Sequence, residues 1–277
     1  MSTFLGNNAQ YIRFPFDKFI EDMKAFNVKN VDLSLMTPHY YVDSNEAKDI
    51  ANVKAKLKQA DIKVKCVTPP PYRYSICAEE GFIQQKKTLE YYSRCIDVAE
   101  YLETDYINIT LSGACFDYKK ERLIESACAN LKSMVEFAEK HNKTFLIGTV
   151  LSEADSPINA TTPVGISIED ISEIVNSVNS RHLSVYLDVA TVSLCGETIE
   201  QWFKNFGEKI SLIRFSDGNY NGFRALGDGC LPCRKIYNEI LNYGYKGDFS
   251  LQTQGEKYID DPKNLFFKDF SYIKENL

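Results

Sequence analysis

The stretch LSVYLDVATVSLCGETIEQWFKNFGEKISLIRF, residues 183–215, decides the fold of this chain. It begins with a short β-rich run at residues 183–187, continues through an amphipathic helical pattern at residues 198–206, and ends in a second β-rich run at residues 210–215. A strand, a helix and another strand in this order form the unit from which parallel sheets are built. The sequence therefore predicts a strand–helix–strand unit here.

Runs of the same kind recur along the chain. Strands are predicted at residues 31–35, 62–67, 106–111, 144–149, 183–187, 210–215 and 248–252, with helical patterns between them. Residues 3–6 and a helix over residues 16–26 supply an eighth unit. Eight units predict an α/β fold, a (β/α)8 TIM barrel that occupies residues 1–277 as a single domain. A doubly wound open sheet is the alternative, but no G-x-G-x-x-G sequence follows the first strand.

The composition argues against several classes of protein. The net charge is −6 and the pI is about 5.3, so the 277 residues offer no basic face for nucleic acid. No apolar run approaches the ~18 residues that a membrane helix needs, and the start of the chain lacks the features of a signal peptide. Eight cysteines fit reduced thiols in a cytoplasmic protein. The C-x-x-C sequence at residues 230–233 is isolated, which favours an incidental pair over a redox or metal site.

In a TIM barrel the active site lies at the carboxyl ends of the strands, so candidate site residues are expected there. At or within one residue of the ends of the last four predicted strands lie Gly148, Asp188, Arg214 and Gln252. Asp188 carries the carboxylate of this set, Arg214 is a permanent cation and Gln252 is a neutral amide. Because proton transfer at carbon needs a positioned base, these positions support at most one-base chemistry.

Two loops at the same end of the predicted barrel carry aromatic and basic side chains. Residues 37–41 contain His39, and residues 69–74 contain Tyr72 and Arg73. Rings that stack on a sugar, beside His and Arg donors, suit a polyol or a phosphorylated ligand. Simple packing of these rings at the barrel rim is an equally weighted alternative.

Four landmarks in the second half of the chain resemble a known superfamily. They are Leu187-Asp188, residues 210–217, the Leu-Gly-Asp-Gly loop at 226–229, and residues 244–251, GYKGDFSL. The chain resembles the sugar phosphate isomerase/epimerase superfamily, the xylose-isomerase-like TIM barrels, and within it the ketose 3-epimerases such as the fructoselysine epimerases. The resemblance covers nearly the whole chain.

The resemblance implies a metal site that this chain does not keep. Members of the family bind a divalent ion such as Mn²⁺ or Mg²⁺ through Glu, Asp, His and Glu at the ends of strands five to eight, and the two Glu residues also act as acid and base. The corresponding positions here are Gly148, Asp188, Arg214 and Gln252. We therefore expect no metal cofactor: Arg214 replaces the positive charge and pairs with Asp188, and Gln252 supplies a hydrogen bond. Glu153, five residues past Gly148, is the nearby carboxylate that would rebuild a metal site.

The resemblance also implies two substrate contacts in the loop after strand seven, Asp217 and Arg224. A backbone cap is the alternative for Asp217, and a surface role is the alternative for Arg224.

Three functions follow from these observations. The first is an isomerase or epimerase of carbohydrate metabolism that acts on a ketose, a sugar phosphate or a ketoamine, with Arg214 as electrophile and Asp188 as base or as an orienting group. The second is a non-catalytic relative that binds a sugar or a partner subunit. The third, a nuclease, is disfavoured by three histidines and the acidic pI. We expect a small-molecule carbohydrate partner, no nucleic acid and no membrane. A homo-oligomer is left open.

Overall fold

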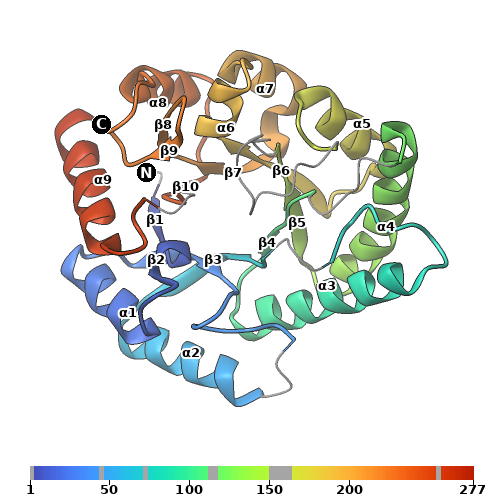
Figure 1. The fold of residues 1–277 in the computed structure, drawn as a ribbon, viewed down its shortest axis with the longest axis horizontal. Coiled ribbons are helices and arrows are strands. Elements are labelled where there is room, and N and C mark those ends of the chain that lie inside the picture. The colour runs from blue at the N-terminus through green and yellow to red at the C-terminus, as the bar shows by residue number, and fades with distance from the viewer. Residues whose placement is uncertain (1–2, 44–46, 71–73, 112–117, 150–163, 254–256) are drawn as a thin grey trace.

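The computed structural model describes residues 3–43, 47–70, 74–111, 118–149, 164–253 and 257–277. Within them, eight parallel strands close into a barrel in the order β1-β10-β7-β6-β5-β4-β3-β2, and Figure 1 shows this ring surrounded by helices. The strands are β1 (Phe4–Asn7), β2 (Asn30–Ser34), β3 (Lys63–Thr68), β4 (Tyr106–Asn108), β5 (Thr144–Ile147), β6 (Leu183–Asp188), β7 (Ile210–Arg214) and β10 (Asp248–Ser250). The closed ring confirms the predicted (β/α)8 barrel.

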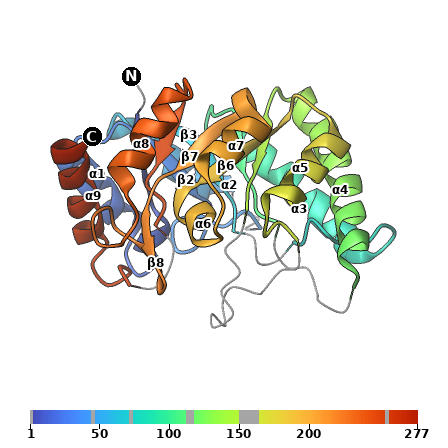
Figure 2. The same ribbon diagram turned by 90° about the horizontal axis from the view of Figure 1, so that it is seen from above.

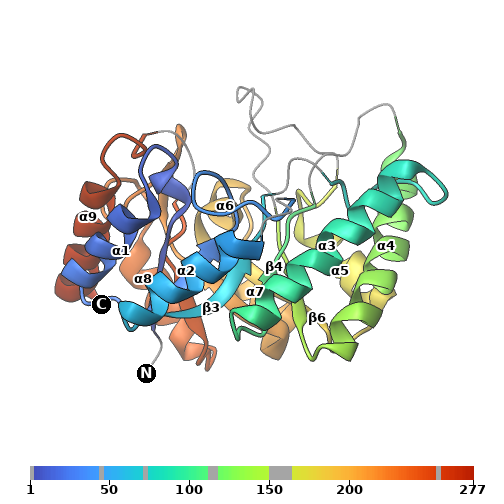
Figure 3. The same cartoon turned by 90° about the horizontal axis from the view of Figure 1, so that it is seen from below.

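Helices connect the strands and cover the outside of the ring. They are α1 (Phe16–Ala25), α2 (Ala47–Gln59), α3 (Ile83–Tyr101), α4 (Lys120–Lys140), α5 (Ile168–Val178), α6 (Val189–Leu194), α7 (Ile199–Phe206), α8 (Cys233–Asn242) and α9 (Pro262–Asn276), with a 3₁₀ turn η1 (Ala9–Tyr11) after β1. Figure 3 shows α1 to α4 lying along one side of the barrel. None of the helices that the structure describes is both long enough and apolar enough to cross a membrane.

The helices form where apolar residues recur three or four positions apart, as in α5. Ile171, Ile174 and Val178 of this helix are buried against the strands. The Ser167 side chain caps its start by accepting a hydrogen bond from the Asp170 N–H.

Two elements were not predicted, and three strands are shorter than expected. The short helix α6 follows β6 directly, and a hairpin of β8 (Asp217–Asn219) and β9 (Gly222–Arg224) follows β7. Figure 2 shows both at the end of the barrel where the strands finish. β4, β5 and β10 each stop two or three residues before the predicted end. Beyond the ends of these strands, single backbone hydrogen bonds replace the regular pairing. One of them runs from the Leu251 N–H to the Leu5 carbonyl (3.0 Å).

The barrel interior has an apolar floor below a polar layer. Side chains from five strands form a separate buried cluster inside the ring: Leu5, Cys66, Leu146, Tyr186 and Leu212. Because side chains alternate along a strand, the residues two positions further on point the same way. Those residues are Asn7, Thr68, Gly148, Asp188 and Arg214. Three of the strand-end residues singled out from the sequence, Gly148, Asp188 and Arg214, are therefore in the polar layer.

Candidate active site

Arg214, the last residue of β7, lies in the polar layer with an exposed fraction of 2%. When the amide oxygen of Asn108 faces the guanidinium, Nη2 and Nε of Arg214 donate to it over 2.6 and 3.1 Å. The Cζ atom of Arg214 also lies 4.2 Å from the centroid of the Tyr186 ring. A cation–π contact in such a dry place contributes about 2 kcal/mol. Asn108 and Tyr186 together fix the position of the cation.

The Tyr186 ring explains why position 148 is a glycine. A Cβ atom on Gly148 would lie 2.5 Å from Cε2 of Tyr186 and 2.6 Å from the carbonyl oxygen of the same residue. Real Cβ contacts are longer than 3.0 Å, so any side chain at this position requires the ring and the backbone to move. Tyr186 therefore occupies the space that a ligand side chain on the end of β5 would need.

Asp32 is a second buried acid in this layer, and it was missed in the sequence. It lies in the middle of β2 and is fully buried. Its two carboxylate oxygens accept hydrogen bonds from the hydroxyls of Thr68 and Ser250, each over 2.7 Å. Burial raises the pKa of Asp32, and the positive charge of Arg214 and these hydroxyls act in the opposite direction. A charged residue between Val31 and Leu33 was the available signal.

Asp188 has a different set of partners. As the N-cap of α6, its carboxylate accepts a hydrogen bond from the Thr191 N–H over 3.0 Å. Burial raises the pKa of Asp188, while the charge of Arg214 and the backbone N–H groups of α6 lower it. The expected direct pair with Arg214 is not formed: among the described residues, the printed partners of the guanidinium are Asn108 and Tyr186, and Arg214 influences Asp188 through its field.

Gln252 lies beyond the end of β10 with an exposed fraction of 8%, and its carbonyl oxygen has no hydrogen-bond partner within the described chain. It therefore does not make the expected contact with the Arg214–Asp188 pair through that oxygen. Four other buried polar groups near strand ends share this property: Gln10, Thr149, Ser216 and Thr253. Buried polar atoms without partners are few in native proteins, so these groups distinguish the strand ends from most of the described chain.

His39, which the sequence places in a loop at the barrel mouth, forms hydrogen bonds within the protein. It is buried, and its Nδ1 and Nε2 atoms contact the Asn8 side chain (2.8 Å) and the Phe14 carbonyl (3.0 Å). Because the carbonyl accepts, Nε2 carries the proton and Nδ1 accepts from Asn8. Burial lowers the pKa of His39. This arrangement favours the packing alternative. Tyr72, Arg73 and Glu153 lie outside the described residues.

The carboxylate of Asp217, at the start of β8, accepts hydrogen bonds from backbone N–H groups. Its oxygens accept hydrogen bonds from the N–H groups of Gly218, Gly227, Gly229 and Leu231 over 2.7, 3.1, 3.1 and 3.0 Å. This is the backbone cap that the sequence left as an alternative. It holds the loop after β9 to the hairpin, which positions that loop near the strand ends.

Arg224, at the end of β9, donates to the Phe223 carbonyl over 2.6 Å and is partly exposed. Asp217 pairs with it across the hairpin, but no contact between the Arg224 side chain and the polar layer is present in the described part of the chain. The described hydrogen bond of the Arg224 side chain is therefore to the backbone of its own hairpin.

The donor set does not fit a divalent cation. Gly148 offers no side chain, and Arg214 brings a permanent positive charge to the place of a neutral imidazole. The described residues contain no group of three or more His, Cys, Asp or Glu side chains close enough to hold a metal ion. Asp188 with the amide of Gln252 is a poor cage for Mn²⁺ or Mg²⁺, which prefer several oxygen ligands.

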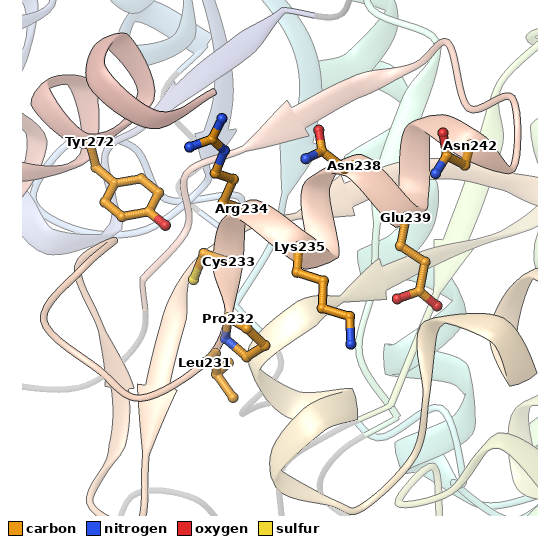
Figure 4. Close-up of a pocket in the computed structure, with 9 residues that line it drawn as sticks. All are labelled: Leu231, Pro232, Cys233, Arg234, Lys235, Asn238, Glu239, Asn242 and Tyr272. Atoms are coloured by element: carbon orange, nitrogen blue, oxygen red, sulfur yellow. The ribbon is translucent and has the colours of Figure 1, made fainter.

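A hollow of about 740 Å³ lies elsewhere, on the outside of α8. Figure 4 shows that its lining comes from α8, the turn before it and Tyr272 of α9. Cys233 of the C-x-x-C sequence lines this hollow, and both Cys230 and Cys233 are free thiols. Burial, together with the charge of Asp217, raises the pKa of Cys233, so its thiol is unreactive. The chemistry of the strand ends is separate from this surface.

Comparisons with known proteins agree with the barrel fold. A family model described as "Xylose isomerase-like TIM barrel" matches residues 14–276. Fructoselysine 3-epimerase of Shigella flexneri is 20% identical over 255 residues, which cover 91% of this chain and 89% of that protein. The same enzyme of Escherichia coli O157:H7 is also 20% identical, with 91% and 90% covered.

Solved structures share the fold at low identity. The IOLI protein with a binding zinc atom has a TM-score of 0.80 and 14% identity, with 100% of this chain and 99% of that chain covered. D-psicose 3-epimerase of Clostridium cellulolyticum H10 with D-tagatose has a TM-score of 0.76 and 14% identity, with 99% and 97% covered.

Proposed function

Because the chain belongs to the xylose isomerase-like TIM barrel family, we propose that it is an isomerase- or epimerase-like protein that binds a ketose, or a ligand derived from one, at its strand ends without a divalent metal. Relatives named for the epimerisation of fructoselysine and D-psicose support this class of ligand. The proposal that no metal is bound rests on the position of Arg214. A buried cation held by Asn108 and Tyr186 lies at the strand end where the resemblance implies an imidazole ligand, which supports the proposal.

Arg214 and Asp188 supply the chemistry that remains. Removing a proton from the carbon beside a carbonyl leaves negative charge on the carbonyl oxygen, and a fixed guanidinium stabilises such charge. A guanidinium has five N–H groups, of which Asn108 takes two, so others remain to donate to a ligand oxygen. Asp188 is the candidate base, because burial raises its pKa toward the range that suits proton abstraction.

The second candidate is a binding protein without turnover. Epimerisation in the family uses a facing pair of carboxylates, and here those positions are Gly148 and Gln252. The amide of Gln252 is not protonated near neutral pH, so it cannot act as a base. With one base, proton removal and return occur on the same face, which exchanges hydrogen without inverting the carbon.

The metal-free part of the proposal is tested by metal content and thermal unfolding. We expect less than a tenth of an equivalent of Mn, Mg or Zn in the purified chain, and no rise in Tm when these ions are added, because only ligands of the folded state stabilise it. About one ion per chain, with a Tm rise that Asp188→Asn abolishes, would overturn this part.

The catalytic part is tested by NMR of ketoses incubated with the protein in D2O. Deuterium entering at the carbon next to the carbonyl, abolished by Asp188→Asn, supports an enzyme. Binding of the ketose without any exchange supports the second candidate. If no ketose binds or exchanges, the carbohydrate function itself is wrong.

A further inference from the structure

The loop of residues 225–231 is held mainly by side chains. It joins β9 to α8, and such connections lie at the carboxyl ends of the barrel strands. Two of its seven backbone N–H groups, those of Asp228 and Cys230, donate to backbone carbonyl oxygens. The other five donate to side chains. Their acceptors are the Tyr258 hydroxyl for Ala225, Oδ1 of Asp269 for Leu226, and the carboxylate of Asp217 for Gly227, Gly229 and Leu231.

The two acids that hold this loop are unequal anchors. Asp217 accepts four N–H hydrogen bonds, which are shared between its two oxygens. Asp269, on α9, accepts one N–H hydrogen bond at Oδ1, from Leu226 over 2.8 Å, and its Oδ2 atom has no partner in the described chain. Its exposed fraction is 1%. A buried carboxylate with an oxygen that meets neither a donor nor water is costly as an anion. Asp269 is therefore the weaker anchor.

The charges around Asp269 disfavour a further negative charge. Asp217 on β8 and Asp228 in the loop bring negative charges near it, and Lys268 beside it on α9 brings a positive one. The Lys268 ammonium group is partly exposed and donates to Oδ2 of Asp228 over 2.5 Å, so its charge is shared with that acid and with water. The neutral titratable groups near the same acids are the Tyr258 hydroxyl and the Cys233 thiol.

We infer that Asp269 is a pH-sensitive latch for the loop: its protonated carboxyl group holds the Leu226 end closed, and loss of this proton to solvent lets that end open to water. Opening brings the carboxylate into contact with water and separates its charge from those of Asp217 and Asp228. The hydrogen bonds to Asp217 are unaffected by this proton, so the opening is local to the Leu226 end. The inference concerns the loop itself and does not depend on which ligand the strand ends bind.

The direction of the pH dependence follows from the surroundings of Asp269. Burial raises the pKa of this acid to about 8. The Leu226 N–H and Lys268 lower it, and the charges of Asp228 and Asp217 raise it. Once the loop is open, the pKa returns toward the ordinary value near 4. The acid therefore stabilises the closed loop fully at pH values below its pKa in the open loop. This contribution is lost as the pH rises through about 8.

Amide hydrogen exchange of the full ¹⁵N-labelled chain between pH 5 and 9 tests the inference. Dividing the exchange rate of the Leu226 N–H by its intrinsic rate at each pH gives the opening constant of this site. We expect that constant to rise by up to about tenfold per pH unit between pH 5 and 8 and to level off above pH 8. The amides of Gly229 and Leu231, which Asp217 holds, are internal controls and should not follow this rise.

Two variants and a matched control separate the proton from the packing. Asp269→Asn keeps an acceptor oxygen for the Leu226 N–H but has no proton to lose, so its opening constant should not change with pH. Asp228→Asn removes a negative neighbour and frees Lys268, so the opening constant should level off at a lower pH than in the wild type. Asp61→Asn, on an exposed site, should leave the exchange of Leu226 unchanged.

Two further readouts on the wild type need no substitution. The ¹³C resonance of the Asp269 carboxyl carbon should titrate with a midpoint near 8, the pH at which opening levels off. Because a local opening exposes little surface, 1 M urea should not accelerate the exchange of Leu226. A carboxyl midpoint below pH 5, or a pH-dependent rise that persists in Asp269→Asn, would overturn the inference. Exchange of Leu226 that follows Gly229 and Leu231 at every pH, or that accelerates in urea, would also overturn it, because the opening would then not be local.

Discussion

The Cζ atom of Arg214 lies 4.2 Å from the centroid of the Tyr186 ring, and the same ring fills the space beside Gly148. The two departures from the family's metal ligands are therefore physically linked. Because position 148 has no side chain, there is room for the Tyr186 ring, and this ring packs against the Arg214 guanidinium. A larger side chain at position 148 therefore requires the Tyr186 ring to move, and with it a contact of Arg214.

Gly148→Ala tests this link directly. Its Cβ atom would meet both the Tyr186 ring and the Tyr186 carbonyl oxygen well below normal contact distance. We expect the free energy of unfolding in urea to fall by about 1–3 kcal/mol, the usual effect of overpacking. Gly148→Glu should be at least as destabilising and should not create Mn²⁺ binding. A Gly148→Ala protein as stable as the wild type would contradict the packing argument.

Arg214→Leu should destabilise the chain in a pH-dependent way. Removing the cation takes away the charge that favours the ionised forms of Asp32 and Asp188. It also leaves the buried Asn108 amide without its donor, which by itself costs about 1–3 kcal/mol. The pKa values of both acids are raised in the folded state. A group whose pKa is raised in the folded state contributes its full stabilisation at pH values below its pKa in the unfolded state. This contribution is lost as the pH rises through its pKa in the folded state. Because the substitution raises both pKa values further, the loss relative to wild type should grow with pH.

Urea unfolding at pH 5 and pH 8 measures this difference, and Arg214→Lys provides the control for charge without the planar contact to Asn108. The double variant Arg214→Leu with Asp32→Asn should recover part of the stability at pH 8, since it removes one uncompensated carboxylate. Equal losses for Arg214→Leu at both pH values would show that packing, and not charge, accounts for the effect.

The sequence predicted the barrel well and its interior poorly, for a physical reason. The β-rich runs and helix periodicities are local signals, so the eight units could be read one at a time. The partners of Arg214 could not, because Asn108 on β4 and Asp32 on β2 meet it only once the ring closes. The available signal was a polar residue inside an apolar strand, as at Asp32.

The unpredicted hairpin and α6 had local signals as well. The Asn221-Gly222 pair at the β8–β9 turn is a common hairpin sequence. Asp188 directly before an apolar run is compatible with a helix N-cap, and its carboxylate accepts from the Thr191 N–H three residues later.

Asp217→Ala should loosen one loop more than the whole chain. The substitution removes the acceptor of four backbone N–H groups. We expect a loss of about 2–4 kcal/mol, because hydrogen bonds to a charged group are stronger than average. In hydrogen exchange, the amides of Gly227, Gly229 and Leu231 should lose protection first. Asp61→Asn, on an exposed site, is the matched control. Unchanged exchange at these amides would count against the cap.

Asp269→Asn should flatten the dependence of stability on pH. Asp269 in α9 is buried, accepts a hydrogen bond from the Leu226 N–H (2.8 Å), and its other oxygen has no partner in the described chain. Burial raises its pKa to about 8. Between the unfolded value near 4 and this value, the folded state holds the extra proton, so wild-type stability is greatest at low pH and declines as the pH rises toward 8.

One such proton contributes a slope of at most ~1.4 kcal/mol per pH unit, which urea unfolding at pH 5, 7 and 9 resolves. Asp269→Asn has no proton to lose, so its stability relative to wild type should improve as the pH rises. Asp61→Asn is the contrasting control: Lys29 lowers the pKa of Asp61, so its contribution is lost only as the pH falls and should not change between pH 7 and 9. Parallel pH profiles for wild type and Asp269→Asn would mean that Asp269 is already ionised at pH 5, held by its contact with Leu226 and by the nearby charge of Lys268.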